Sequence, residues 1–248
     1  MTEKKVAFLV AGAQKSGTSA LDAYLREHPE LCFPREKELH FFDTDRLFAV
    51  EPVDYAPYHA LFDPKPPQRL LGESTPAYLY WPHAVERIAR YNPAMRFIIL
   101  LRNPITRAYS HWNYERLVHR EPLGFLEAVH AYAERQSTMT PGRAKRFAYV
   151  DRGYYTQQLE RLWARFPVAQ TLIFKSELLL DEPATVLARI AEFLGVAPFP
   201  PLPDKSRNTR EYEAPMSADE KRHLVGLYAE EIRALERLLG WDCSAWLA

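Results

Sequence analysis

An apolar run that leads into a short loop bounded by two glycines constrains the fold of this chain more than any other feature. Residues 8–11 are apolar, Gly12 and Gly17 bound a loop that contains Lys15, and residues 18–21 read as the first turn of a helix. Such a turn has unpaired backbone N–H groups and the positive end of the helix dipole, and glycines let the backbone close around an anion. The stretch therefore predicts a strand, a phosphate-binding loop and a helix in an α/β protein.

The lysine stands at an unusual place in this loop. In the common nucleoside-triphosphatase pattern, G-x-x-x-x-G-K-[ST], the lysine follows the second glycine and the next hydroxyl residue holds magnesium. Here Thr18 follows the second glycine and Lys15 lies inside the loop. The sequence therefore disfavours a magnesium-dependent kinase or ATPase. A glycine loop that merely joins a strand to a helix is the alternative to a phosphate site.

A second apolar run, residues 97–101, also ends beside a residue that suits phosphate. Arg102 follows the run directly, Asn103 is placed to cap the next helix, and a proline fits that helix's first position. Asn103, Thr106 and Ser110 share one helix face because their spacing is i, i+3 and i+7. A guanidinium at a strand end with a hydroxyl on the adjoining helix suits a phosphate monoester. Taken singly, the arginine has a surface ion pair as its alternative role, and the serine a solvated helix position.

These two segments resemble the nucleotide-binding segments of the sulfotransferases that use 3′-phosphoadenosine 5′-phosphosulfate (PAPS). Residues 14–19 are similar to that family's loop for the 5′-phosphosulfate, and residues 97–110 are similar to its site for the 3′-phosphate. The resemblance implies PAPS as the co-substrate and adenosine 3′,5′-bisphosphate (PAP) as the product. The cofactor-binding residues that it implies are Lys15, Ser16, Gly17, Thr18, Ser19, Arg102 and Ser110.

Residues 35–43 resemble the K-E-x-x-F-F-D segment of the glycosaminoglycan and bacterial branch of that family. In that branch the glutamate is the proposed general base. The resemblance thus implies that Glu38 removes the acceptor's hydroxyl proton while Lys15 neutralises the departing phosphate. His40 is a third catalytic candidate, because it projects the same way as Glu38 if the segment is extended, and Asp43 is placed to hold one of the two. The alternatives are an exposed carboxylate for Glu38 and a hydrogen-bonded core histidine for His40.

Two further stretches bear on the ligands. Residues 73–76 correspond to the E-K-S-P stretch typical of heparan sulfate enzymes, but Ser74 replaces the lysine. This departure disfavours a glycosaminoglycan acceptor and favours the smaller acceptors of bacterial members. Residues 205–210 occupy the place of the family's loop over the nucleotide. Lys205 and Arg207 are therefore candidates for cofactor binding, with a solvated basic loop as the alternative.

Composition argues against several other classes of protein. Thirty-two basic and 32 acidic residues give a formal net charge of +0, so no global field attracts nucleic acid or an anionic membrane. No apolar run has the length that crosses a bilayer, and the first residues lack the pattern of a signal peptide. Eukaryotic polysaccharide sulfotransferases are usually Golgi membrane proteins, so the resemblance together with this lack of a span implies a bacterial, cytoplasmic enzyme, although a catalytic domain cut from a longer chain would look the same. The eight histidines and two cysteines show no metal-ligand spacing, so we expect no metal ion. The oligomeric state stays open.

Strand and helix patterns alternate along the chain. We expect one domain over residues 1–248, with an α/β, P-loop-like, three-layer fold in which helices cover both faces of a central, mainly parallel sheet. Residues 122–152 read as an added helix and a flexible loop between Gln136 and Lys145, which would form an insertion or lid on the acceptor side. The expected strands are residues 6–11, 31–33, 69–73, 96–101 and 170–174, and the expected helices are 17–28, 82–91, 104–119, 154–165, 183–194 and one that starts with a capping box at 217–220.

The sequence thus predicts a PAPS-dependent sulfotransferase that acts by in-line displacement on a hydroxyl group. The acceptor is a small molecule, a carbohydrate or a carrier-bound group, and its identity stays open. A P-loop kinase of small molecules is the first alternative, opposed by the absence of a lysine after Gly17 and by Arg102 where a kinase offers an acidic magnesium partner. A nucleotide-binding relative that has lost catalysis is the second.

Overall fold

The computed structural model describes residues 5–201 and 214–248, which form two compact units. Of the described residues, 5–101 and 160–201 belong to the first unit, and 102–159 and 214–248 belong to the second. The prediction that one domain spans the chain stays a prediction. Among the described residues, no helix is both long and apolar enough to cross a membrane.

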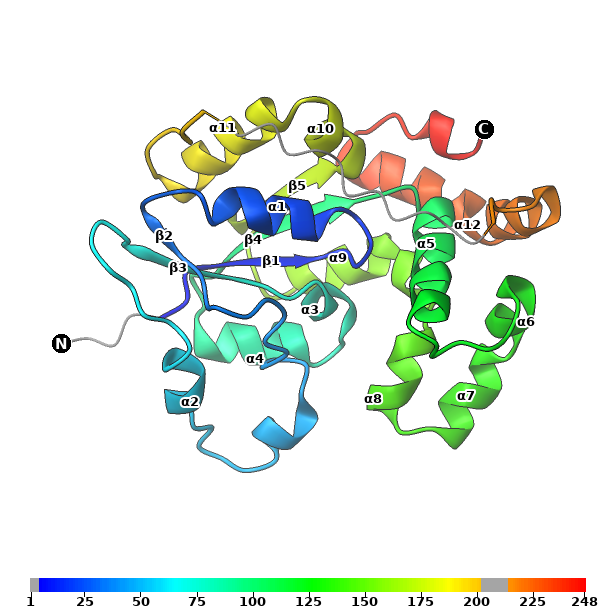
Figure 1. The fold of residues 1–248 in the computed structure, drawn as a ribbon, viewed down its shortest axis with the longest axis horizontal. Coiled ribbons are helices and arrows are strands. Elements are labelled where there is room, and N and C mark those ends of the chain that lie inside the picture. Colours follow the sequence, from blue (N-terminus) through cyan, green and yellow to red (C-terminus); the bar gives the residue numbers. More distant parts are fainter. Residues whose placement is uncertain (1–4, 202–213) are drawn as a thin grey trace. The chain divides into compact units, whose positions relative to one another are not determined.

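The first unit contains a five-stranded, all-parallel sheet with the order β2-β3-β1-β4-β5 (Figure 1). Its central strands are continuous apolar runs because a parallel strand covered on both faces has no solvent side. Every residue of β1 is buried, and the last five residues of β4 are buried as well. The strands are β1 (Phe8–Gly12), β2 (Leu31–Cys32), β3 (Leu70–Ser74), β4 (Arg96–Leu101) and β5 (Thr171–Lys175).

Helices cover both faces of this sheet, which confirms the predicted fold class. Buried side chains of α1 and α11 pack with those of β1, β4 and β5 in one core. Figure 1 shows α1 and α11 on one face, and α3 and α4 on the other. The helices of this unit are α1 (Thr18–Leu25), α2 (Ala56–His59), α3 (Ala77–Tyr80), α4 (Ala84–Tyr91), α10 (Ser176–Asp181) and α11 (Pro183–Leu194).

The second unit is helical, and its two longest helices begin as predicted. The Asn103 side chain accepts a hydrogen bond from the Ile105 N–H, and Pro104 opens α5. The capping box at Ser217 and Glu220 opens α12. The helices here are α5 (Pro104–Leu117), α6 (Phe125–His130), α7 (Tyr132–Thr138), α8 (Pro141–Ala144) and α12 (Ala218–Leu239), while α9 (Tyr155–Trp163) begins in this unit and ends in the first.

The predicted flexible loop between Gln136 and Lys145 is wrong, because α7 and α8 occupy most of it. The proline in this stretch opens α8, a position that costs no hydrogen bond, rather than breaking structure. The preceding helix is tied down by a buried ion pair in which both end nitrogens of the Arg135 guanidinium contact the Glu121 carboxylate. The role of residues 122–152 as a lid stays a prediction.

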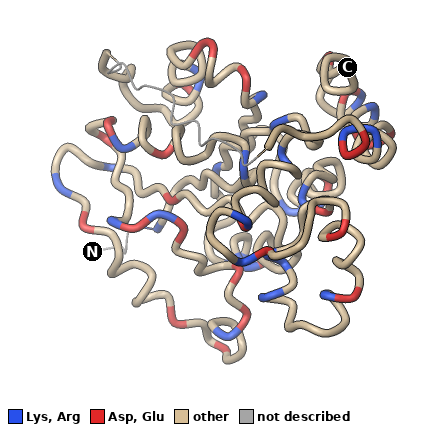
Figure 2. The backbone as a smooth tube through the Cα atoms, turned by 45° about the vertical axis from the view of Figure 1, so that its right-hand side comes forward, with Lys and Arg blue, Asp and Glu red and all other residues tan. Residues whose placement is uncertain are grey.

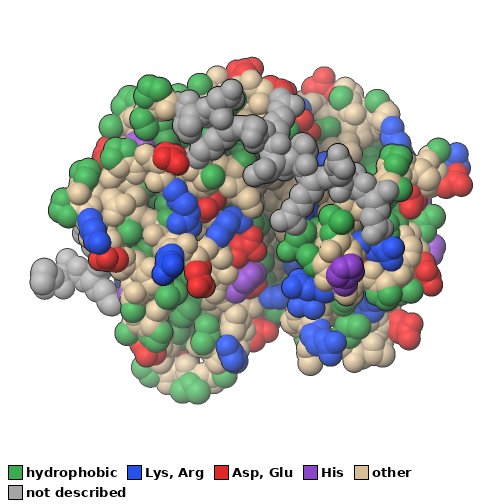
Figure 3. All heavy atoms as spheres, viewed as in Figure 1, with side chains coloured by type: hydrophobic (Ala, Val, Ile, Leu, Met, Phe, Trp, Pro, Cys, Tyr) green, Lys and Arg blue, Asp and Glu red, His purple; other side chains and the backbone are tan. Residues whose placement is uncertain are grey.

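Charges of both signs are interspersed in this structure. Basic and acidic positions are both spread along the backbone, and the face seen in Figure 3 carries both among apolar side chains (Figures 2 and 3). This distribution agrees with the formal net charge of +0. Any site for an anion must therefore be built from local groups.

Candidate functional site

The predicted phosphate loop joins β1 to α1 through two residues in the left-handed backbone region. Lys15 has φ 70° and Gly17 has φ 89°. The Ser16 N–H donates to the Ala13 carbonyl at 3.2 Å, which closes a turn inside the loop. A methyl group at Gly17 would meet neighbouring atoms no nearer than 3.9 Å, so the backbone angle and not the space requires glycine there.

This loop leaves polar groups for a ligand. Gly17 caps α1 without a side-chain hydrogen bond, and within the described residues the N–H groups of Thr18 and Ser19 have no acceptor. The Ser16 side chain is fully buried, and its hydroxyl has no partner among those same residues. A buried hydroxyl without a partner needs an explanation, and a phosphate oxygen would supply the missing acceptor. The loop therefore offers donor groups that suit an anion such as a phosphate.

The segment that carries Glu38 lies at the same edge of the sheet as this loop. The Glu38 N–H donates to the carbonyl of Ser74, the last residue of β3, at 3.0 Å. Ser74 pairs with Val10 of β1, two residues before β1 ends at Gly12. Since the two strands are parallel neighbours, their carboxyl ends place the Glu38 segment beside the phosphate loop.

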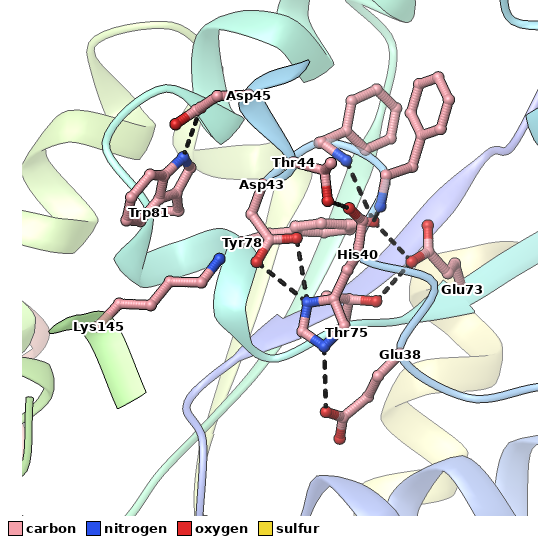
Figure 4. Close-up of polar contacts among 12 residues, drawn as sticks. Glu38, His40, Asp43, Thr44, Asp45, Glu73, Thr75, Tyr78, Trp81 and Lys145 are labelled. Atoms are coloured by element: carbon pink, nitrogen blue, oxygen red, sulfur yellow. Dashed lines mark hydrogen bonds and ion pairs between the residues drawn. The ribbon is translucent and has the colours of Figure 1, made fainter. Parts of the chain in front are cut away.

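Glu38, His40 and Asp43 form a connected row of side chains (Figure 4). The His40 Nε2 lies 3.7 Å from the Glu38 Oε2, and the His40 Nδ1 lies 3.0 Å from the Asp43 Oδ2. The Asp43 side chain is fully buried, whereas those of Glu38 and His40 are 40% and 45% exposed. A buried carboxylate thus orients an imidazole whose other nitrogen faces an exposed carboxylate.

Glu38 and His40 do lie in contact, but the extended segment that was expected to bring them together is absent. Residues 38–40 are not extended: Glu38 has φ 62° and His40 has φ 53°. A left-handed backbone in a residue other than glycine costs about 1–3 kcal/mol and persists only where the surroundings impose it. The two side chains therefore meet through two strained residues and not through the alternation of a strand.

This row can carry out proton transfer at an exposed position. Because a carboxylate only accepts hydrogen bonds, Asp43 holds a proton on the Nδ1 of His40 and leaves the Nε2 to face Glu38. Lys37 Nζ contacts the Glu38 Oε1 at 2.5 Å and places a positive charge beside the carboxylate. These contacts thus orient the Glu38 carboxylate.

Sequence reasoning gave no role to a buried carboxylate at the end of β3. Glu73 is completely buried and accepts hydrogen bonds from Tyr58, Thr75 and Tyr78. Burial raises the pKa of Glu73, although the three hydroxyl donors oppose the shift. The signal available was a glutamate that directly follows the run Leu70–Gly72 within a predicted strand.

The residues predicted to bind the other phosphate, Arg102 and Ser110, lie in the second unit. Arg102 directly follows β4, and its Nε donates to the Thr106 Oγ1 at 3.0 Å. The Thr106 hydroxyl donates in turn to the Asn103 carbonyl at 3.2 Å. Ser110 is a buried residue of the same helix, α5. That Arg102 and Ser110 bind the same ligand as Lys15 stays a prediction.

Two of the residues predicted to bind the nucleotide cannot be placed, because Lys205 and Arg207 lie outside the described residues. In residues 5–201 and 214–248, no group of three or more His, Cys, Asp or Glu side chains is arranged to hold a metal ion. Cys32 and Cys243 are both buried.

Comparison with known proteins adds to this geometry. Residues 5–217 match the protein family described as the Sulfotransferase domain. The mouse protein heparan sulfate glucosamine 3-O-sulfotransferase 6 is 32% identical over 190 residues, which cover 76% of this chain and 52% of that protein. The chain therefore spans about half the length of this relative. The membrane-associated sulfotransferase kil1 of Dictyostelium discoideum is 23% identical, with 95% of this chain and 65% of that protein covered.

A solved structure matches along nearly the whole chain. The crystal structure of a sulfotransferase from Alicyclobacillus acidocaldarius superposes with a TM-score of 0.83 at 29% sequence identity. The match covers 98% of this chain and 99% of that one. The likeness is thus one of fold and of sequence together.

Proposed function

This chain belongs to the sulfotransferase domain family, and from that membership we propose that it moves a sulfuryl group from PAPS to a hydroxyl group of its acceptor. The observation that carries the proposal is the juxtaposition at one sheet edge of the phosphate loop and the row Glu38–His40–Asp43. A loop that holds a phosphosulfate and a proton acceptor beside it are the two parts that such a transfer needs.

In the proposed reaction Glu38 removes the proton of the acceptor hydroxyl. PAPS supplies a sulfur that forms a bond to the acceptor oxygen while its bond to the 5′-phosphate oxygen breaks and the electron pair leaves with PAP. His40, held by Asp43, orients the acceptor or shares the proton with Glu38. No oxidant or reductant takes part.

The phosphate loop of the first unit stabilises the charge that develops on the departing phosphate. Lys15 supplies a positive charge, and the backbone N–H groups of Thr18 and Ser19 supply fixed dipoles at the start of α1. Ser16 supplies a hydroxyl donor, and Gly17 supplies the backbone turn. We assign Arg102 and Ser110 to the 3′-phosphate, and Lys205 and Arg207 to further contacts with the nucleotide.

The acceptor that we propose is a small-molecule, carbohydrate or carrier-bound alcohol. The name of the mouse relative specifies a glucosamine of heparan sulfate as its acceptor. This chain has Ser74 at the position where heparan sulfate enzymes typically carry a lysine, so it lacks a cation that would face a sulfated polysaccharide. A panel of such alcohols, with heparan sulfate among them, tests this choice through transfer of labelled sulfate from PAPS.

Substitution of Glu38 tests the catalytic assignment. We expect Glu38→Gln to lower the rate of sulfate transfer by between about a hundredfold and ten-thousandfold, because the amide cannot accept the hydroxyl proton. Glu36→Gln is the matched control, because it removes the same charge from an exposed neighbour in the same segment. If Glu38→Gln transfers sulfate at the rate of Glu36→Gln, Glu38 is not the base.

Ligand binding separates this proposal from the kinase alternative. We expect isothermal titration calorimetry to show tight binding of PAP and weak binding of ATP with magnesium, since Lys15 is not at the position that a triphosphate loop requires. The opposite order of affinities would favour a kinase. Binding of PAP without any sulfate transfer would favour a relative that has lost catalysis.

A further inference from the structure

A buried carboxylate and a tyrosine sit directly behind the loop that carries Glu38 and His40. Glu73 has no exposed surface, and its carboxylate accepts three hydroxyl hydrogen bonds, including one from Tyr78 at 2.7 Å and one from Thr75 at 2.5 Å. Tyr58 donates to the other oxygen of the carboxylate. Burial of a carboxylate is costly, and apolar residues of the same size often stabilise a core as well or better. The cluster therefore calls for a reason other than stability.

The cluster reaches the loop through the Tyr78 hydroxyl. That oxygen accepts a hydrogen bond from the Phe41 N–H at 3.0 Å and a longer one from the Phe42 N–H at 3.5 Å. A phenol hydroxyl can donate one hydrogen bond, and Tyr78 donates it to the Glu73 carboxylate. Glu73 thereby fixes the hydroxyl with its lone pairs toward the loop, so that it acts as an acceptor for the backbone between His40 and Asp43.

The same loop is also held by hydrogen bonds of the backbone at Glu38 and His40 and by contacts of its two phenylalanine rings. The Glu38 N–H donates to the Ser74 carbonyl, and the Thr44 hydroxyl donates to the His40 carbonyl at 2.5 Å. The Phe41 ring stacks on Tyr58 with centroids 4.5 Å apart. The Phe42 ring meets Tyr78 edge to face at 5.5 Å. The contacts converge on a segment whose two functional residues have strained backbones.

We propose that Glu73 and Tyr78 are positioning residues, which hold the backbone of Phe41 so that Glu38 and His40 keep the geometry needed for proton transfer. Both side chains are completely buried, so neither reaches an acceptor and neither is a catalytic residue. Release of the Phe41 N–H leaves the left-handed residues free to relax toward their ordinary backbone angles. Figure 4 shows Tyr78 and Glu73 lying beside the row that they support. The inference rests on the proposed role of Glu38 as the base.

Two phenylalanine substitutions separate positioning from general stability. Tyr78→Phe and Tyr58→Phe each remove one hydroxyl donor to Glu73 from a ring that is at most 1% exposed. Only Tyr78→Phe also removes the acceptor for the Phe41 N–H. We expect a larger fall in melting temperature for Tyr78→Phe than for Tyr58→Phe, because Tyr78→Phe also leaves the buried Phe41 N–H without its acceptor. Only Tyr78→Phe should lower kcat, by between about tenfold and a hundredfold, with the Kd for PAP within about twofold of wild type.

The measurement is kcat per PAP-binding site, at a temperature where circular dichroism shows both variants folded. Counting sites by titration with PAP removes the contribution of unfolded protein. Thr44→Val is the second variant, because it unties the same loop at the His40 carbonyl, and it should also lower kcat. Equal kcat values for Tyr58→Phe and Tyr78→Phe would overturn the inference, as would a Thr44→Val variant with unchanged kcat.

The outcome for Glu38→Gln shows which idea has failed. If Glu38→Gln is inactive while the two tyrosine variants are alike, the positioning role fails and the proposed base stands. If Glu38→Gln stays fully active, the base assignment fails, and the inference falls with it because no geometry of Glu38 needs support.

Discussion

The left-handed backbone of Gly17 gives a quantitative test of the phosphate loop. Gly17→Ala adds a methyl group to a residue with φ 89°. Its nearest neighbours would lie 3.9 Å away, so packing contributes little and the backbone term dominates. That term is about 1–2 kcal/mol for an L-residue in the left-handed region. It appears as lost stability if the loop keeps its conformation, or as weaker PAP binding if the loop relaxes and turns its N–H groups away.

Gly195→Ala is the matched control for this substitution. Gly195 caps α11 with φ 66°, and a methyl group there would meet no atom within 4 Å. The variant therefore carries a comparable backbone cost without touching the phosphate loop. We expect the control to lose about 1–2 kcal/mol of stability and to bind PAP as the wild type does.

Urea unfolding and calorimetric titration with PAP measure the two terms. For Gly17→Ala, the loss of unfolding free energy and the loss of binding free energy should together reach about 1–2 kcal/mol, which is a factor of between about five and thirty if it all falls on binding. A Gly17→Ala variant that matches the wild type in both measurements, while Gly195→Ala is destabilised, would refute the reasoning.

Two further predictions concern buried charges. Arg135→Met should cost about 3–5 kcal/mol of unfolding free energy, because it leaves the buried Glu121 carboxylate without its cation. Arg233→Met, which breaks an exposed ion pair, should cost less than about 1 kcal/mol. Similar losses for the two variants in urea unfolding would contradict this prediction. Burial raises the pKa of Glu73 in the folded protein above its ordinary value of 4.5. The folded protein therefore binds this proton more tightly than the unfolded protein does, and the free energy of unfolding should fall as pH rises from about 4.5 through the raised pKa. Glu73→Gln should flatten that fall in urea unfolding at several pH values, and parallel curves for wild type and variant would count against it.

Elements with strong local signals were predictable from the sequence. The strand at residues 96–101 is found at the predicted bounds because an uninterrupted apolar run needs burial on both faces. The starts of α5 and α12 follow from Asn103 with its proline and from the capping box at Ser217. At both helix starts the deciding interaction joins residues at most three positions apart.

Other elements depended on contacts that the sequence does not display. The helix α10 directly follows β5 with no cap or glycine between them, and sequence analysis missed it. The helical form of residues 141–144 went against a composition typical of loops. The left-handed backbones of Glu38 and His40 are held by Ser74 and Tyr78, which lie 36 and 37 residues away from Glu38 and Phe41 in the chain. No local sequence pattern predicts a contact between residues so far apart in the chain.

The two halves of the first unit's candidate site therefore differ in what determines them. The phosphate loop is shaped mainly by its own residues, through the turn at Ser16 and the backbone of Gly17, with one added hydrogen bond from the Ala13 N–H to the Leu100 carbonyl of β4. The Glu38 loop is built from outside, by β3 and by the tyrosines behind it. Substitutions in that core should then change kcat while leaving the affinity for PAP intact, whereas substitutions in the loop at Gly17 should weaken PAP binding. A separation of this kind is expected only if nucleotide binding and proton transfer reside in distinct, independently held segments.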